Sequence, residues 1–195
     1  YLKKKLGSNK VLITGALRRE IKDNEFKIYN SIYLFQDRKV ISYEKKRLVP
    51  FGEFIPLKSI LDLLKITPGE TDFSKGEKAR LMSFEYDERK ISFEPSICYE
   101  AIFQTSNDKE ISLLINITND AWFGKTTGPK QHLAASIFRS VEKGVPLVRS
   151  ANSGISVITD KTGQIVKRLD LNQTGFIDFE VITQKNSTFF SENKK

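Results

Sequence analysis

The sequence predicts a layered α/β protein that forms a single domain over residues 1–195. Short apolar runs of β-rich composition recur along the chain, and one long amphipathic helix lies among them. No internal repeat, low-complexity block or Gly/Ser linker divides the chain. With 195 residues and a hydrophobic share of 39%, it is long enough to bury a sizeable core. Strands mixed with helices are typical of sheets covered by helices.

The strand candidates are short runs rich in β-branched and aromatic residues. The first, residues 11–15, is apolar, as expected of a strand buried on both faces. Two hairpins are predicted, with turns at residues 36–39 and 87–89, and a further turn at residues 161–163. The predicted strands are 11–15, 27–35, 40–43, 81–86, 90–93, 112–117, 146–149, 154–159 and 176–181.

The clearest helix begins at Gly128-Pro129, because proline is favoured at the first helical position. Gly144, with Pro146 just beyond it, ends the helix. Apolar residues at helical spacing predict the buried face: Leu133, Ala134, Ile137, Phe138 and Val141. A second, short amphipathic helix is predicted at residues 56–66. It is either a lid on a bilayer surface or an ordinary helix covering the sheet.

Composition excludes several classes of function. No run approaches the roughly 18–20 apolar residues that a membrane-spanning helix requires. A single cysteine, Cys98, excludes an internal disulfide, and one histidine beside it leaves too few ligands for a typical structural zinc site. We therefore expect no metal and no cofactor. Lys and Arg outnumber Asp and Glu by 32 to 24, but they are scattered among acidic residues, so we expect no nucleic-acid partner.

Cys98 is the first candidate for chemistry. An extended segment turns towards a helix at this residue, and backbone N–H groups at such a turn lower the pKa of a thiol. The alternative is a buried structural cysteine, since free cysteine is among the most buried residue types. Glu100, two residues later, argues against a wholly apolar site. His132, the only histidine, is predicted to be a hydrogen-bonding residue in the first turn of its helix.

Two further clusters contain residues that could take part in catalysis or contact a substrate. A strand runs into a turn-rich loop that carries Lys45 and Glu53, and a lysine near a thiolate favours the anion and can stabilise an oxyanion. Taken alone, Lys45 is better explained as part of a solvated basic run. Trp122 and Phe123 follow a strand and read as a pocket wall, or alternatively as a packing plug between layers.

Together these clusters resemble the carbon–nitrogen hydrolase (nitrilase) superfamily, and within it the apolipoprotein N-acyltransferase branch. The resemblance covers residues 10–180 and rests on ordered motifs: Y-x-K-x-x-L, L-V-P-F-G-E-F-I-P, I-C-Y-E, N-D-A-W-F-G, G-P-x-Q-H-L and R-S-A-N-S-G-I-S. It implies an α-β-β-α sandwich with mixed sheets, incomplete at the N-terminus. The superfamily's general-base glutamate lies in a W-P-E-type motif that this chain lacks, so no residue is assigned to that role and the chain alone is expected to be inactive.

The resemblance also implies a reaction and its site residues. Cys98 would take an acyl chain from a phospholipid as a thioester and pass it to the N-terminal amino group of a lipidated apolipoprotein. Lys45 would support the oxyanion and the thiolate, and Glu53 would orient Lys45 and assist proton movement. The residues implied in substrate binding are Tyr99, Glu100, Phe51, Trp122 and Phe123.

The same resemblance places the domain on the outer side of the bacterial inner membrane, with membrane helices outside this chain. Three alternatives stay open. A soluble carbon–nitrogen hydrolase could use the same Cys98–Lys45 pair on small amides or nitriles. The others are a basic nucleic-acid-binding module and a scaffold without catalytic activity.

Overall fold

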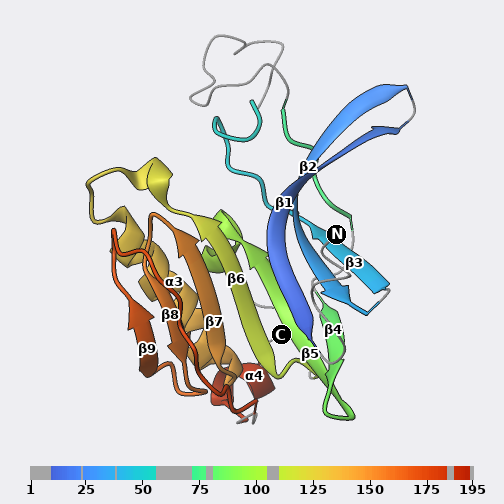
Figure 1. Ribbon diagram of the computed structural model, residues 1–195. Coiled ribbons are helices and arrows are strands. Elements are labelled where there is room, and N and C mark those ends of the chain that lie inside the picture. The colour runs from blue at the N-terminus through green and yellow to red at the C-terminus, as the bar shows by residue number, and fades with distance from the viewer. Residues whose placement is uncertain are drawn as a thin grey trace.

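The structure, a computed structural model, describes residues 10–22, 24–37, 39–55, 72–77, 81–104, 110–183 and 187–193. The helix predicted at residues 56–66 lies outside these ranges. The described elements form two β-sheets and one long helix, arranged in layers (Figure 1).

The smaller sheet is antiparallel and has the order β1 (Val11–Lys22), β2 (Glu25–Gln36) and β3 (Lys39–Glu44). The first predicted hairpin is thereby confirmed. The strand predicted at residues 11–15 is confirmed as the first part of β1, but its short length and its burial on both faces are wrong. Within the described residues β1 is a long edge strand, which packs Val11 and Ile13 on the core and leaves Leu17 and Ile21 exposed.

The larger sheet runs in sequence order through β4 (Met82–Tyr86), β5 (Arg89–Ile97), β6 (Leu113–Asn119), β7 (Leu147–Asn152), β8 (Ser156–Thr159) and β9 (Ile165–Leu169). β5, β6 and β7 are parallel and the other neighbours are antiparallel, so this sheet is mixed. The second hairpin is confirmed with a tighter turn than expected. Asp87 and Glu88, both with positive φ, form its two-residue loop.

The predicted strand at residues 176–181 is wrong, and β9 takes its place at the edge of the larger sheet. Residues 173–183 are irregular, and Phe176 is 90% exposed. In the segment Ile165–Leu169, Lys167 and Arg168 interrupt the β-rich pattern, so the sequence does not indicate a strand there. The segment forms a strand because it pairs with β8. A β-rich composition without a partner strand does not form a sheet.

Helix α3 (Gly128–Lys143) confirms the predicted limits, with Pro129 in its first turn and Gly144 in the left-handed conformation at φ 69°. Its buried face differs from the prediction. Phe138 and Val141 are 61% and 43% exposed. The buried residues are largely polar: Pro129, His132, Leu133, Ser136, Ser140 and Lys143. Apolar spacing failed as a guide because the strands beneath α3 present polar side chains to it, among them Arg149.

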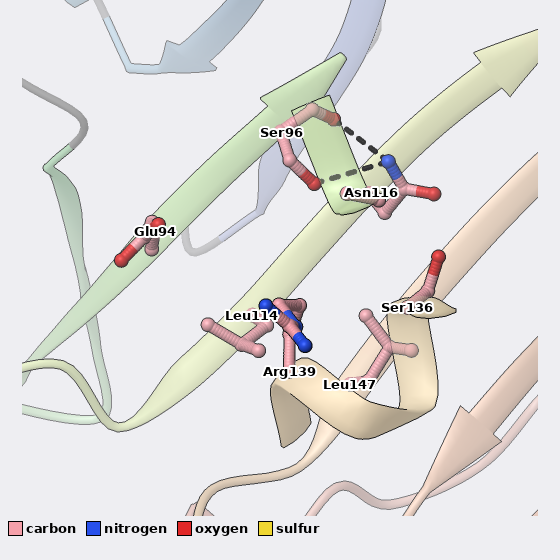
Figure 2. Close-up of a pocket in the computed structure, with 8 residues that line it drawn as sticks. Glu94, Ser96, Leu114, Asn116, Ser136, Arg139 and Leu147 are labelled. Carbon is pink, nitrogen blue, oxygen red and sulfur yellow. Dashed lines mark hydrogen bonds between the residues drawn. The ribbon is translucent and has the colours of Figure 1, made fainter. Parts of the chain in front are cut away.

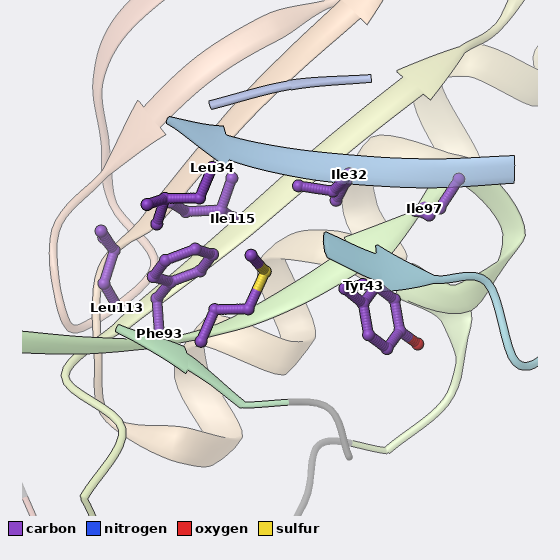
Figure 3. Packing of buried hydrophobic residues seen from close by; sticks show 8 residues of the cluster. Ile32, Leu34, Tyr43, Phe93, Ile97, Leu113 and Ile115 are labelled. Carbon is purple, nitrogen blue, oxygen red and sulfur yellow. The ribbon is translucent and has the colours of Figure 1, made fainter. Parts of the chain in front are cut away.

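The core lies between the two sheets, with a second cluster under α3. Ile32 and Leu34 of the smaller sheet pack on Phe93 and Ile115 of the larger one (Figure 3). Leu114 points the opposite way and joins the cluster beneath α3, as expected from strand alternation. Three layers of the predicted α-β-β-α sandwich are therefore described, with α3 against the face of the larger sheet that lies away from β1–β3 (Figure 1).

Three short helices complete the described elements: η1 (Cys98–Ile102), η2 (Ala121–Phe123) and α4 (Phe189–Asn193). None of the helices in the described ranges combines the length and the apolar character needed to cross a bilayer.

Candidate active site

Cys98 is the first residue of η1, directly after the carboxyl end of β5. The predicted turn from strand to helix is confirmed. The backbone of Cys98 has φ 48°, a left-handed conformation that costs a non-glycine residue about 1–3 kcal/mol. Ligands in open sheets with parallel strands bind at the carboxyl ends of those strands, and Cys98 stands at such an end. The thiol is half-buried, so it is neither sealed in the core nor fully exposed.

Glu100 ties this turn to the loop that follows β3. Its side chain is fully buried and accepts a hydrogen bond from the Ile97 N–H at 3.0 Å. From the other side it accepts the Tyr43 hydroxyl at 2.8 Å and the Lys46 N–H at 2.8 Å, with the Arg47 N–H at 3.2 Å. These donors satisfy a carboxylate that would otherwise be costly to bury. The result is a fixed connection between the Cys98 turn and the segment that carries Lys45.

Lys45 and Glu53 form a buried ion pair. Lys45 is 1% exposed, and its Nζ lies 2.8 Å and 2.7 Å from the two carboxylate oxygens of Glu53. The backbone of Lys45 donates to the Asn30 carbonyl at 2.8 Å, and the Val49 N–H donates to Glu53 at 2.8 Å. Both side chains are thus held by the main chain around them, which gives the ammonium group a defined position.

A cavity of about 190 Å³ joins the thiol to this ion pair. Cys98 and Glu53 both line it, whereas Lys45 is paired with Glu53 but is not one of the lining residues. The complete lining is Gly15, Asn30, Ser31, Ile32, Glu53, Ile97, Cys98, Ile117, Thr118, Asn119 and Trp122. One part of this wall is apolar and the other carries hydrogen-bonding groups, so the cavity can hold both a hydrocarbon segment and a carbonyl group.

The residues expected to contact substrate are only partly assembled around this cavity. Trp122 lines it and is 66% exposed. Four do not line it within the described ranges: Phe51, Tyr99, Glu100 and Phe123. Tyr99 packs edge-on against Phe103 with ring centroids 5.0 Å apart, and Phe123 packs on His132 at 5.6 Å.

Several lining residues escaped the sequence analysis. Asn30 and Ser31 lie within β2, and Thr118 lies near the end of β6. None of them stands in a motif of its own, and only the packing of one sheet on the other brings them beside Cys98. The one signal was the polar end of β6, where Asn119 follows an apolar run.

A second cavity lies on the other side of the larger sheet, beneath α3, and has a volume of only about 10 Å³ (Figure 2). Asn116 lines it and donates to the Ser96 carbonyl at 3.1 Å and the Ser96 hydroxyl at 3.0 Å. A void of this size holds at most one water molecule, so it offers no room for a substrate.

A buried polar cluster of Asp120, His132 and Arg149 lies next to the Cys98 turn. His132 Nδ1 lies 2.9 Å from Asp120 Oδ1, and Arg149 Nη2 lies 2.7 Å from Asp120 Oδ2. Burial alone would raise the pKa of Asp120, but the hydrogen bond from His132 and the charge of Arg149 outweigh it and lower that pKa. The prediction that His132 is a hydrogen-bonding residue of the helix is confirmed. Among the described residues no group of His, Cys, Asp and Glu side chains could hold a metal ion.

A family profile and two curated relatives match this chain over most of its length. The family profile for carbon-nitrogen hydrolases matches residues 7–185. The chain is 41% identical over 187 residues to the apolipoprotein N-acyltransferase of Rickettsia prowazekii (strain Madrid E), covering 93% of this chain and 37% of that protein. It is 42% identical over 188 residues to the protein of the same name from Rhizobium etli (strain CIAT 652), covering 90% of this chain and 34% of that protein.

Solved structures share the fold at lower sequence identity. An amidase from Nesterenkonia sp. is similar with a TM-score of 0.57 and 19% identity, over 84% of this chain and 58% of that one. A glutamine-dependent NAD+ synthetase from Acinetobacter baumannii is similar with a TM-score of 0.61 and 15% identity, over 87% of this chain and 30% of that one. The chain spans just over a third of the length of the curated relatives it matches. By its sequence profile and its fold, the chain belongs to the carbon–nitrogen hydrolase family.

Proposed function

We propose that this chain is the catalytic domain of an apolipoprotein N-acyltransferase. The enzyme would transfer an acyl chain from a membrane phospholipid, through a thioester on Cys98, to the N-terminal amino group of a lipidated apolipoprotein. The observation that carries the proposal is the cavity at the end of a parallel strand, which is lined by Cys98 and by Glu53, the buried partner of Lys45. The relatives at about 40% identity support the choice of reaction within the family.

The first half-reaction forms the thioester. The sulfur of Cys98 attacks the ester carbonyl carbon of the phospholipid, and the ester C–O bond breaks. The thiol proton ends on the departing lysophospholipid hydroxyl, so atoms and charges balance. The Lys45 ammonium stabilises both the thiolate and the oxyanion of the tetrahedral intermediate, and Glu53 holds the ammonium in position. We assign no residue of this chain to the step that carries the proton from the thiol to the leaving group.

The second half-reaction consumes the thioester. The free amino group of the acceptor attacks the thioester carbonyl, the C–S bond breaks, and the proton lost by the amine returns to the Cys98 sulfur. Trp122 forms a wall for the acyl chain where the cavity opens. Tyr99, Phe51 and Phe123 extend the binding surface around it, and Glu100 acts on substrate by fixing the Cys98 turn.

The location follows from the substrates. A phospholipid donor and a lipidated acceptor are both held in a membrane, so the cavity has to open towards a bilayer. We place the domain on the outer side of the bacterial inner membrane, where its acceptors are anchored. The open position of Trp122, 66% exposed, suits a cavity that receives lipid from one side.

The test is N-acylation by the complete gene product that contains this chain. The protein is incubated with phosphatidylethanolamine vesicles and a synthetic diacylglyceryl lipopeptide, and mass spectrometry measures the acylated lipopeptide. Cys98→Ala is expected to abolish product. Lys45→Arg is expected to slow the reaction about 100-fold, because a planar guanidinium cannot reproduce a point charge in this buried site.

The matched control is Lys39→Arg, since Lys39 is exposed at the far end of the same strand, β3. It is expected to leave the rate unchanged. N-acylation that survives Cys98→Ala would contradict the proposal. Hydrolysis of small amides without any acyl transfer would instead favour a carbon–nitrogen hydrolase that uses the same pair.

A further inference from the structure

The polar cluster of Asp120, His132 and Arg149 is buried and makes a direct contact with the nucleophile's backbone. The three side chains come from the end of β6, from α3 and from β7, and they are 1%, 4% and 2% exposed. His132 Nε2 lies 3.0 Å from the carbonyl oxygen of Cys98. None of the three lines the 190 Å³ cavity, so the cluster acts on the site from behind Cys98.

The two ring nitrogens of His132 both face acceptors. Nε2 faces the Cys98 carbonyl, and Nδ1 faces a carboxylate oxygen of Asp120 at 2.9 Å. A carbonyl and an ionised carboxylate can only accept, so both hydrogen bonds form when each nitrogen carries a proton. Arg149 Nη2 carries two protons, so it can donate to Asp120 Oδ2 at 2.7 Å and also towards Nδ1 at 3.2 Å. The donor role of Nε2 is fixed in either case, because the Cys98 carbonyl can only accept.

The imidazole lies between one carboxylate, Asp120, and one guanidinium, Arg149. The charged or titratable groups that face the ring are Asp120, Arg149 and, through its own carbonyl, Cys98. The ring of Phe123 lies against the imidazole at a centroid distance of 5.6 Å.

The backbone of Cys98 is the part of the site that needs support. Its φ of 48° is a conformation that persists only where surrounding contacts hold it. Glu100 fixes the Ile97 N–H just before the nucleophile, and His132 fixes the carbonyl of the nucleophile itself. One contact is made to the residue before the nucleophile and the other to the nucleophile's own carbonyl.

We propose that His132 is a positioning residue for the nucleophile. Held by Asp120 and Arg149, it donates from Nε2 to the Cys98 carbonyl, fixes this part of the backbone and keeps the sulfur at the cavity. This inference rests on the proposed role of Cys98 as the attacking group. It predicts that the identity of the donor at the Nε2 position controls the reactivity of the thiol.

The experiment measures the alkylation rate of Cys98 by iodoacetamide as a function of pH. Cys98 is the only cysteine of the chain, so the reaction reports on one thiol. Glutamine at position 132 places an amide N–H near the Nε2 position, whereas asparagine places one near Nδ1. We therefore expect the rate at neutral pH to fall about tenfold in His132→Asn and His132→Ala, and less in His132→Gln. The difference between the Gln and Asn variants is expected at every pH at which the thiol reacts, because it follows from the position of the N–H donor.

The matched control is Ser140→Ala on the same helix. Ser140 is fully buried and donates to the Val145 carbonyl, far from the contact with Cys98. This variant is expected to lose stability without changing the alkylation rate. Thermal unfolding of every variant separates a folding defect from an effect on the thiol, and the comparison of Gln with Asn remains decisive if His132→Ala does not fold.

Equal rates in the Gln and Asn variants, or a wild-type rate in folded His132→Ala, would overturn the inference. N-acylation by the complete gene product is measured in the same variants. If alkylation depends on His132 but the wild-type protein transfers no acyl group, the positioning role stands and the proposed function fails. If acyl transfer proceeds and alkylation ignores His132, the positioning role alone fails.

Discussion

At the scale of single residues, the site depends on ions that are buried with their partners. Lys45 is 1% exposed and the side chain of Glu53 is 14% exposed, so neither charge is well solvated. A buried pair of this kind contributes little compared with an apolar pair, but the loss of one partner leaves the other charge uncompensated. The pair therefore constrains the position of the ammonium group more than it stabilises the fold.

Glu53→Gln is expected to lower the free energy of unfolding by about 3–5 kcal/mol, because it strands the Lys45 ammonium in the interior. The double variant Lys45→Met with Glu53→Gln is expected to recover a large part of that loss. Urea unfolding of the two single variants and the double variant measures the coupling.

Glu20→Gln serves as the control for this pair. Glu20 pairs with Arg18 near the surface, with side chains 32% and 30% exposed, and its loss is expected to cost at most about 1 kcal/mol. A double variant less stable than Glu53→Gln would contradict the ion-pair account.

The lowered pKa of Asp120 predicts how the stability of the protein depends on pH. Its pKa in the folded protein is lowered from 3.8, because the hydrogen bond from His132 and the charge of Arg149 outweigh the effect of burial. The unfolded chain therefore takes up the proton first as the pH falls. The stabilisation is complete above about pH 4 to 5 and is lost progressively at lower pH, down to the pKa of the folded state.

Asp120→Asn is expected to flatten the acid limb of a plot of unfolding free energy against pH. The pKa of Asp160 is also lowered, because the hydrogen bonds from Thr162 outweigh its burial, so Asp160→Asn removes a separate part of the same limb. The slopes of unfolding free energy against pH are compared rather than the free energies themselves, since Asp120→Asn also removes the carboxylate that pairs with Arg149. An unchanged slope in Asp120→Asn would show that folding does not lower the pKa of Asp120.

At the scale of elements, η1 and the loop after β3 behave as one unit because Glu100 accepts donors from both. Glu100 Oε1 faces the Tyr43 hydroxyl and the N–H of Lys46, and Oε2 faces the N–H of Ile97. The sequence places Cys98 and Lys45 more than fifty residues apart. A single buried carboxylate thus sets the distance between the two segments.

Glu100→Gln is expected to destabilise the protein by about 1–3 kcal/mol and to slow the alkylation of Cys98. An amide can keep its oxygen towards one set of donors, but its NH₂ group then opposes an N–H on the other side. Tyr43→Phe removes one donor and leaves the carboxylate, so a smaller loss is expected. If urea unfolding shows that Glu100→Gln is as stable as wild type, Glu100 does not hold η1 and the loop after β3 together.

At the scale of the whole molecule, the sequence predicts the elements whose signals are local. The two hairpins, β6 and both ends of α3 were all predictable, because turn residues, an apolar run, Pro129 and Gly144 act on their own neighbourhoods. The failures concern partners. Phe138 is exposed and Phe176 forms no strand, since burial and pairing depend on which surface the rest of the chain presents.

The candidate site divides in the same way. Cys98, Lys45 and Glu53 could be selected from motifs; the structure brings Cys98 and Glu53 to one cavity and pairs Lys45 with Glu53. Asn30 lies in the middle of a strand and had no chemical signature of its own. The contact of His132 with the Cys98 carbonyl was likewise invisible, because it joins residues 34 positions apart through the packing of α3 on the larger sheet.

The most direct measurement is mass spectrometry of the peptide that contains Cys98. The complete gene product is first incubated with phospholipid vesicles in the absence of a lipopeptide acceptor. We expect an acyl adduct on Cys98 that hydroxylamine removes, that a diacylglyceryl lipopeptide discharges as N-acylated product, and that Lys45→Arg strongly reduces. A Cys98 peptide that stays unmodified while the lipopeptide becomes acylated would contradict the account.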